Sequence, residues 1–118
     1  MKPVSVIFFG SFQHYSTIVL EALYQHPDIN VAGVVTTPPK PAGRKQTITK
    51  THTHLWAESH HVPIFTPEKL TENWKLKIEN SIQNHPDFVV VAGYRNLLPK
   101  SWLDFPVITA LNIHPSLL

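Results

Sequence analysis

Two side chains suited to stabilising an oxyanion, Asn112 and His114, lie two residues apart in the segment ALNIHPSLL (110–118). Pro115 disfavours a helical conformation for the residue before it, which predicts that His114 is extended. In an extended segment, residues i and i+2 point to the same face. We therefore expect an amide and an imidazole side by side, where they could stabilise a developing oxyanion. The alternative is a turn asparagine and a histidine bonded to a backbone carbonyl.

The elements that must position this pair follow from alternating strand and helix patterns. Apolar runs typical of buried strands occupy residues 4–9, 29–37, 62–65, 87–93 and 108–114. Helical patterns occupy residues 16–26, 51–61 and 71–85, and Ser16 is the expected cap of the first. Shorter helical turns are expected at 66–70 and 97–106. A loop with three prolines, 38–50, separates the second strand from the second helix.

This alternation, without hairpin signals between the strands, predicts an α/β fold: a Rossmann-like, open, mostly parallel sheet with flanking helices. Ligands of such sheets bind beyond the carboxyl ends of the strands. Gly10, the 36–50 loop, the 93–99 segment and the pair Asn112 and His114 all fall at that edge. Their convergence predicts the functional site.

The composition excludes several classes of protein. The 118-residue chain has no cysteine, which excludes disulfides, thiolate metal sites and a cysteine nucleophile. Its four glycines form neither a GxGxxG fingerprint nor a P-loop. The first apolar run is too short for a signal peptide or a membrane span, so we expect a cytoplasmic protein with no membrane partner.

Four histidines, His52, His54, His60 and His61, fall in one predicted helix. Side chains two apart on a helix do not share a face, and no thiolate is available to complete a zinc site. We therefore expect solvated histidines and no metal.

The stretch 29–57 contains no acidic residue but does contain Lys40, Arg44, Lys45 and Lys50. A basic loop beside the ligand edge could receive an anion or a phosphate backbone. The alternative is an ordinary solvated loop, and the formal charge of +2 does not by itself imply a nucleic-acid partner.

Four stretches together carry a resemblance to a known family. The run NIHPSLL (112–118), behind AGYRNLLPKSWLDFP (92–106), resembles the signature of enzymes that use 10-formyltetrahydrofolate. The segment FFGSFQHYSTIVLEAL (8–23) is similar to the first strand and helix of that fold, and KPAGR (40–44) resembles the basic loop of its methionyl-tRNA branch. The chain is thus identified as a member of the 10-formyltetrahydrofolate-dependent formyltransferases.

The resemblance implies roles for particular residues. Asn112 and His114 would be catalytic, with Asn112 donating a hydrogen bond to the oxyanion and protonated His114 stabilising or protonating it. The folate site would include Gly93, Tyr94, Leu97, Leu98, Pro99 and Ser116, with backbone groups around Leu97 and Leu98 reading the pterin edge.

The resemblance also implies substrates. A formyl group would pass from 10-formyltetrahydrofolate, without a metal, to the methionyl amine of initiator tRNA. Arg44 would face the tRNA acceptor end, and Lys40 and Lys45 would contact phosphates. The turn GSFQHYS and the run AGRKQTITK depart from the pattern of that branch. Two alternative functions therefore stay open. One is a sugar-nucleotide or other small-amine formyltransferase, and the other is a non-catalytic folate- or nucleotide-binding module.

The resemblance places a third catalytic residue, an aspartate, and part of the folate site after Leu118. We therefore expect residues 1–118 to be the N-terminal part of a catalytic domain, incomplete at its C-terminus and inactive alone.

Overall fold

The computed structural model describes residues 2–82 and 85–113 of the chain. In chain order the elements are β1 (Val4–Phe9), α1 (Gln13–Gln25), β2 (Ile29–Val35), β3 (Lys40–Ala42), β4 (Thr47–Thr49), α2 (His52–Ser59), β5 (Ile64–Phe65), α3 (Glu72–Ile82), β6 (Phe88–Ala92), α4 (Lys100–Leu103) and β7 (Thr109–Ile113). The predicted order of strands and helices is confirmed except at two places: a hairpin is added at β3 and β4, and the helical turn predicted at 66–70 is not formed.

Five of the strands form a single parallel sheet in the order β5-β2-β1-β6-β7. The chain begins in the middle, extends to one edge through β2 and β5, and then returns to build the other half with β6 and β7. The order therefore reverses between β1 and β6, which is the switch point where open α/β sheets bind ligands. The predicted Rossmann-like architecture is confirmed.

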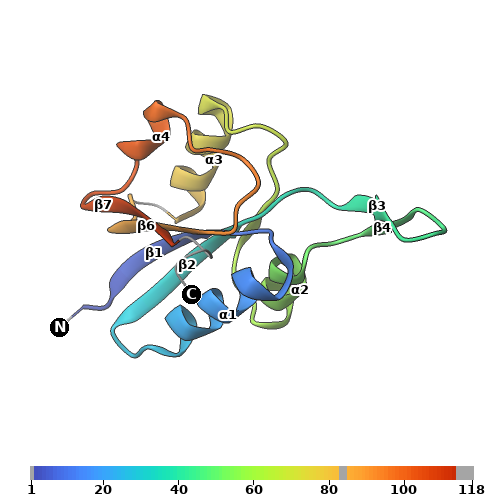
Figure 1. Ribbon diagram of the computed structural model, residues 1–118. Helices are drawn as coiled ribbons and strands as arrows, with labels where there is room; N and C mark the ends of the chain where they lie inside the picture. Colours follow the sequence, from blue (N-terminus) through green and yellow to red (C-terminus); the bar gives the residue numbers. More distant parts are fainter. Residues whose placement is uncertain (1, 83–84, 114–118) are drawn as a thin grey trace.

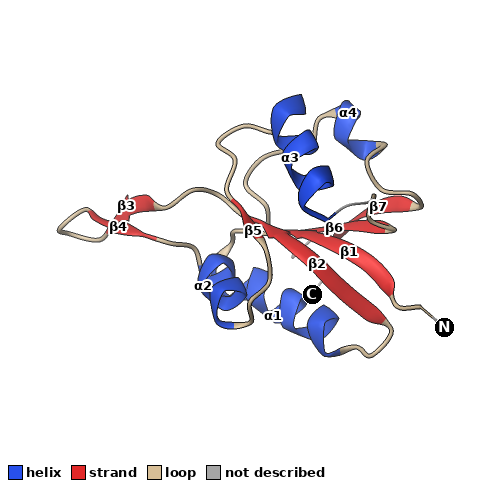
Figure 2. Cartoon of the chain, turned by 180° about the vertical axis from the view of Figure 1, so that it is seen from behind, coloured by secondary structure: helices blue, strands red, loops and turns tan. Residues whose placement is uncertain are grey.

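Helices cover both faces of this sheet. Helices α1 and α2 lie on one face, and α3 and α4 lie on the other (Figures 1 and 2). Strand β1 serves both layers because its side chains alternate: Val6 and Phe8 join the core under α1 and α2, whereas Ile7 and Phe9 join the core under α3 and α4. The continuous apolar run of β1 is thus explained by burial on both sides.

The predicted 38–50 loop is instead a β-hairpin. Strands β3 and β4 pair antiparallel, with Lys40 opposite Thr49 and Ala42 opposite Thr47. A turn joins them, in which the Gly43 carbonyl accepts a hydrogen bond from the Gln46 N–H (3.2 Å), and both residues have positive φ. The hairpin projects from the body as an exposed arm (Figures 1 and 2). The expectation of no hairpin was wrong because Gly43 and the β-branched run 47–49 form a weak turn-and-strand signal among prolines and lysines.

The helices differ from the predictions at two places. Helix α1 begins at Gln13, so Ser16 lies inside the helix and is not its cap. The predicted helical turn at 66–70 does not form, since five residues offer too few hydrogen bonds to offset helix nucleation. Helix α2 is capped by Thr51, whose hydroxyl accepts from the His54 N–H (3.1 Å).

No helix in the described ranges has the length and apolar character needed to cross a membrane.

Candidate functional site

A cavity of about 1050 Å³ lies at the carboxyl edge of the sheet. Its walls come from segments that follow different strands: residues 11–13 after β1, Thr37 and Lys40 after β2, residues 93–98 after β6, and the last residues of β7. The predicted convergence at this edge is therefore present. Of the predicted site residues, the cavity is lined by Lys40, Gly93, Tyr94, Leu97, Leu98 and Asn112.

The floor of the cavity depends on close approach of two backbone segments. Gly93 has φ of 72°, and a Cβ there would lie 2.8 Å from both Phe12 Cβ and Ser16 Oγ. Ser16, fully buried, donates to the Ala92 carbonyl (2.8 Å) and accepts from the Phe12 N–H (2.8 Å). The Ser16 side chain thus joins the start of α1 to the end of β6, which is a tertiary role and not the predicted capping role.

The segment after β6 lines the cavity and carries backbone donors without a protein partner in the described chain. Residues 95–98 lie between β6 and α4, outside any helix or strand. Within the described chain, the peptide N–H groups of these residues make no backbone hydrogen bond. Backbone donors without a partner are available to the polar edge of a ligand. Pro99, the remaining predicted member of this segment, is the N-cap of α4 and lies beside the cavity lining.

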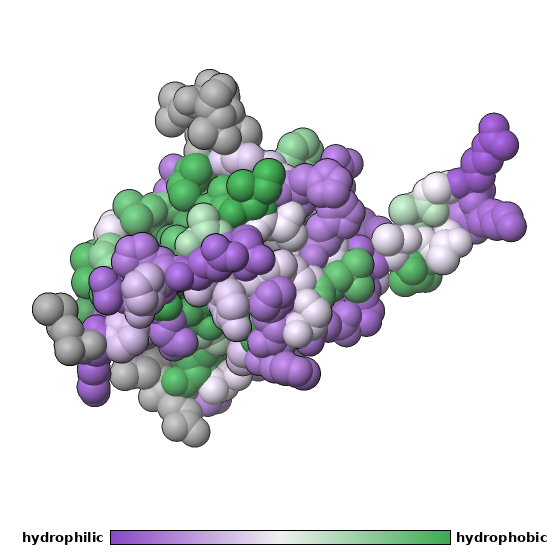
Figure 3. Space-filling model, turned by 90° about the horizontal axis from the view of Figure 1, so that it is seen from below, coloured by the Kyte–Doolittle hydropathy of each residue, from purple (hydrophilic) through white to green (hydrophobic). Residues whose placement is uncertain are grey.

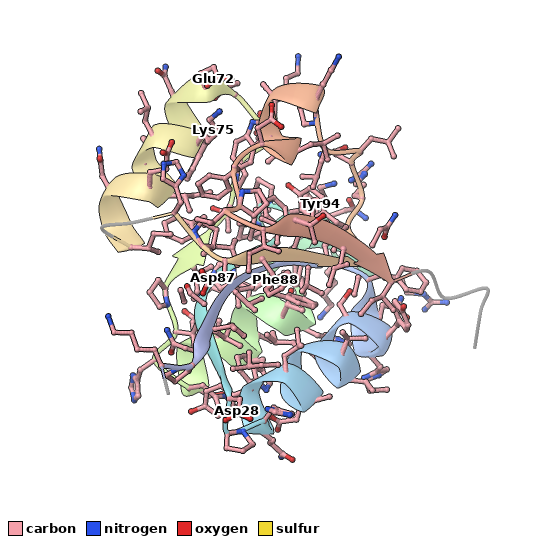
Figure 4. All side chains as sticks on the ribbon, turned by 90° about the vertical axis from the view of Figure 1, so that its left-hand side faces the viewer. Asp28, Glu72, Lys75, Asp87, Phe88 and Tyr94 are labelled. Carbon is pink, nitrogen blue, oxygen red and sulfur yellow. The ribbon has the colours of Figure 1, made fainter. Side chains whose placement is uncertain are left out.

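Tyr94 gives the cavity a buried polar atom. Its ring packs edge-on against Phe9 with centroids 5.4 Å apart, and its hydroxyl is buried without a hydrogen-bond partner of good geometry in the described residues. Burial raises the pKa of the Tyr94 hydroxyl to about 12, against a smaller lowering from the nearby Asn96 side chain. Figure 4 shows Tyr94 on the same side of the sheet as Glu72 and Lys75 of α3, opposite Asp28. Burial therefore keeps the Tyr94 hydroxyl neutral at physiological pH.

Asn112 lies near the end of β7, paired in register with Val91 of β6. Ala110, two residues earlier, packs into the core under α3 and α4, so Asn112 faces the same side of the sheet as Tyr94. Tyr15 of α1 donates to the carbonyl of Ile113 (3.1 Å), which ties the end of β7 to α1. The other predicted members of this region, His114 and Ser116, lie outside the described residues.

The basic residues extend from the cavity into the arm. Lys40 lines the cavity at the base of β3, whereas Arg44 and Lys45 lie in the turn at the far end of the hairpin. Figure 3 shows the arm projecting from the body with a hydrophilic tip. Lys50, after β4, pairs with Glu58 of α2 (2.8 Å). Two cations are therefore held away from the cavity on an exposed arm.

The predicted histidines in and just after α2 make no common site within the described part of the chain. The His52 ring lies against that of His14 (centroids 4.7 Å apart), whereas His60 stacks on Trp56 (4.0 Å). Burial lowers the pKa of His54, with the Glu58 carboxylate acting in the opposite direction. Within residues 2–82 and 85–113, no group of three His, Cys, Asp or Glu side chains could hold a metal ion.

Several cavity residues were not predicted from the sequence. Phe12 and Gln13 line the wall after β1, and Gln13 has φ of 40°, which is uncommon for a residue other than glycine. Arg95 and Asn96, which line the wall after β6, belong to the 93–99 segment that was predicted at this edge. Phe12 and Gln13 follow the carboxyl end of β1, and that position was the available signal.

Comparison with known proteins gives one consistent result. The model of the formyl transferase family matches residues 2–118. The chain is 37% identical over 114 residues to a methionyl-tRNA formyltransferase of Ehrlichia ruminantium, covering 96% of this chain and 36% of that protein. It is 39% identical over 117 residues to that of Anaplasma marginale, covering 98% of this chain and 37% of that protein. The chain therefore spans little more than a third of these curated relatives.

Solved structures show the same fold. The phosphoribosylglycinamide formyltransferase of Anaplasma phagocytophilum superposes with a TM-score of 0.69 at 18% identity, over 97% of this chain and 50% of that chain. A formyltetrahydrofolate deformylase of Pseudomonas putida superposes with a TM-score of 0.65 at 18% identity, over 97% of this chain and 38% of that chain.

Proposed function

Because this chain belongs to the formyl transferase family, we propose that it takes part in transfer of a formyl group from 10-formyltetrahydrofolate to an amine. The acceptor that we propose is the methionyl amine of initiator tRNA, which would place the protein in translation initiation and in the cytoplasm. Residues 1–118 would supply the N-terminal part of the catalytic domain.

The observation that carries this proposal is the chemistry of the cavity at the switch point. A pterin is flat, with apolar faces and an edge of hydrogen-bonding groups. Leu97 and Leu98 supply apolar lining, and residues 95–98 supply unpaired peptide N–H groups. The buried hydroxyl of Tyr94 adds one more unused polar group. The residues present therefore fit a folate, and Gly93, Tyr94, Leu97 and Leu98 would hold it, with Pro99 and Ser116 supporting the site.

Bound there, the folate would supply a formyl carbon that an amine can attack. As the amine nitrogen bonds to this carbon, negative charge develops on the formyl oxygen. Asn112 would donate its amide N–H to that oxygen, and protonated His114 would stabilise the charge. The carbon–nitrogen bond to the folate then breaks, and one proton passes from the amine to the departing nitrogen. Donors fixed in advance at the oxyanion position lower the barrier because they need no reorganisation.

The basic arm supports tRNA over a small amine. Lys40 at the cavity and Arg44 and Lys45 at the tip form a positive path leading away from the reacting centre. Contacts with phosphates orient a nucleic acid without reading its sequence. Several relatives, including those of Ehrlichia ruminantium and Anaplasma marginale, are methionyl-tRNA formyltransferases.

We propose further that the 118-residue chain alone is inactive. Leu97 is 92% exposed, and Leu111 and Ile113 are 48% and 37% exposed. A formyl group at this cavity would remain in water, where hydrogen bonds to the oxyanion are weak.

The decisive experiment restores a full-length protein. Residues 1–118 would replace the matching third of the Anaplasma marginale relative, and formyl transfer would be measured on methionyl-tRNA and on an amino-sugar nucleotide. We expect turnover on methionyl-tRNA, and we expect Asn112→Ala and His114→Ala each to lower kcat by about 10²–10³ with little change in folate affinity.

Asn30→Ala provides the matched control, because Asn30 is an exposed asparagine in β2, a strand that ends at the same edge, but lies near its amino end. Preference for the sugar nucleotide would contradict the tRNA assignment. An unchanged kcat in Asn112→Ala would contradict the catalytic assignment.

A further inference from the structure

Three threonine hydroxyls form a polar cluster at the base of the arm. Thr36 and Thr53 are buried (0% and 1% exposed), and Thr51 is half-buried. Thr36 Oγ1 lies 2.7 Å from Thr51 Oγ1 and 3.0 Å from Thr53 Oγ1, and the last two atoms are 3.1 Å apart. Three hydroxyls from two segments therefore meet at one point.

The cluster is connected to the backbone on two sides. Thr53 Oγ1 donates to the carbonyl of Gly10 (2.8 Å), the residue that follows β1 at the cavity edge. Thr51 Oγ1 accepts from the His54 N–H (3.1 Å) and so caps α2. Because Thr53 carries a single hydroxyl proton, it donates to either the Gly10 carbonyl or Thr36 Oγ1 at one time. The protons of Thr36 and Thr51 serve the Thr36–Thr51 and Thr51–Thr53 contacts. The ends of β1 and β2 and the start of α2 are thereby joined.

The position of Thr36 and Thr51 in the chain gives the cluster its significance. The residues of the arm, from Lys40 to Lys50, are all exposed. Thr36 precedes the arm, separated from it by residues 37–39, and Thr51 directly follows it. The hydrogen bonds of β3, β4 and the turn between them are internal: β3 pairs with β4, Gln46 bonds Gly43, and Thr49 bonds Thr47. The arm's printed contact with the body is at its base, where Lys50 pairs with Glu58 of α2 (2.8 Å). The direction in which the arm leaves the body is therefore decided at its base.

We propose that the Thr36–Thr51–Thr53 cluster is a clasp that fixes the direction of the arm and so positions Arg44 and Lys45 for RNA. This positioning role rests on the proposed function, because it concerns the arm that would contact tRNA. A clasped arm pays less conformational entropy on binding than one that swings freely. Thr36 and Thr53 are not part of the cavity lining and Thr51 lines its edge, so the contribution proposed for the cluster is to hold the arm at a fixed angle to the cavity.

The direct test measures arm position in the 118-residue chain. The chain has no cysteine, so Thr47→Cys on the arm and Gln25→Cys at the end of α1 provide two unique sites for spin labels. Pulsed electron paramagnetic resonance then gives the distribution of label–label distances. We expect a narrow distribution in the parent, a broad one in Thr36→Val, and a narrow one in Thr36→Ser, which keeps the hydroxyl. Equal widths for valine and serine would overturn the proposal.

A second variant covers the case in which Thr36→Val does not fold, as judged by circular dichroism. Thr51→Asn keeps a side-chain acceptor for capping α2 but removes the hydroxyl that contacts Thr36. It should also broaden the distribution, and a parent-like width would overturn the proposal.

RNA affinity separates this inference from the proposed function. A short RNA stem with a single-stranded end would be titrated by fluorescence anisotropy. We expect Thr36→Val to weaken binding roughly three- to tenfold, because the arm must be ordered on binding, and Thr36→Ser to leave it unchanged. A broad distribution with parent-like affinity would refute the positioning role. If instead Arg44→Ala leaves RNA affinity unchanged, the tRNA assignment fails while the clasp, measured by distance, stands.

Discussion

Gly93→Ala should destabilise this fold far more than Gly43→Ala, although both glycines have positive φ. Gly93 has φ of 72° and Gly43 has φ of 76°. A left-handed conformation costs a residue with a Cβ about 1–2 kcal/mol, so the conformational penalty is similar at both positions. The two sites differ in their surroundings: a Cβ at Gly93 meets Phe12 and Ser16 at 2.8 Å, whereas a Cβ at Gly43 meets nothing within 4 Å.

The magnitude follows from these contacts. Neither neighbour of Gly93 can move freely, because Ser16 is held by the Ala92 carbonyl and Phe12 bonds Ser16 through its N–H. Forcing an extra carbon into such a site typically costs about 1–3 kcal/mol. Added to the conformational penalty, Gly93→Ala should lower the free energy of unfolding by about 2–5 kcal/mol, against about 1–2 kcal/mol for Gly43→Ala.

Urea denaturation of the 118-residue chain, followed by circular dichroism, measures both variants against the parent. Fluorescence is a useful second probe because Trp102 is buried. Equal losses in the two variants would show that close approach of α1 and β6 does not determine the stability at Gly93. A loss confined to Gly43→Ala would refute the reasoning entirely.

Three further predictions follow from other parts of the structure. In the full-length chimera, Arg44→Ala should lower the rate of formyl transfer to methionyl-tRNA but leave the slow hydrolysis of the formyl-folate unchanged. An equal loss in both reactions would mean that Arg44 supports the fold or the folate pocket. Burial lowers the pKa of His54 below its ordinary value of 6.5, although the Glu58 carboxylate acts in the opposite direction. The contribution of the neutral His54 side chain to the free energy of unfolding is therefore complete above pH 6.5, and it is lost as the pH falls through the lower pKa of the folded state. His54→Gln should flatten that part of the stability profile, and a profile that keeps its slope would contradict this. Strand β7 is an outer strand of the described sheet and exposes Leu111. The 118-residue chain should therefore self-associate in analytical ultracentrifugation, and Leu111→Lys should reduce this association. A monodisperse monomeric parent would contradict the prediction.

The sheet could be predicted from the sequence because its signals are local. Residues 4–9 and 87–93 are short, apolar and rich in β-branched side chains, as expected of strands covered on both faces. Parallel connection then determines which ends of the strands meet, and the cavity at that edge follows from topology alone. Lys40, Gly93, Tyr94, Leu97, Leu98 and Asn112 could be placed there without knowledge of any contact.

The hairpin could not be predicted with the same certainty because its pairing depends on residues that are weak strand formers. Pro41 cannot donate a ladder hydrogen bond, and it is tolerated in β3 because the two-stranded arm has only edge strands. Lysines and prolines around it are typical of loops. The sequence therefore supports either an irregular loop or a short hairpin at this place, and pairing with Thr47–Thr49 decides between them.

Ser16 shows why the polar contacts of the site are harder to predict than its position. A serine near the start of a helix has a hydroxyl suited to a backbone partner, and the capping prediction assigns it the nearest one. In the structure the same hydroxyl donates to Ala92, 76 positions along the chain, and Tyr15 beside it donates to Ile113, 98 positions along. Residue type shows that a hydroxyl needs a partner but not whether that partner is local. Two adjacent hydroxyls of α1 thus hold the ends of β6 and β7, so α1 helps to define the geometry of the cavity as well as packing against the sheet.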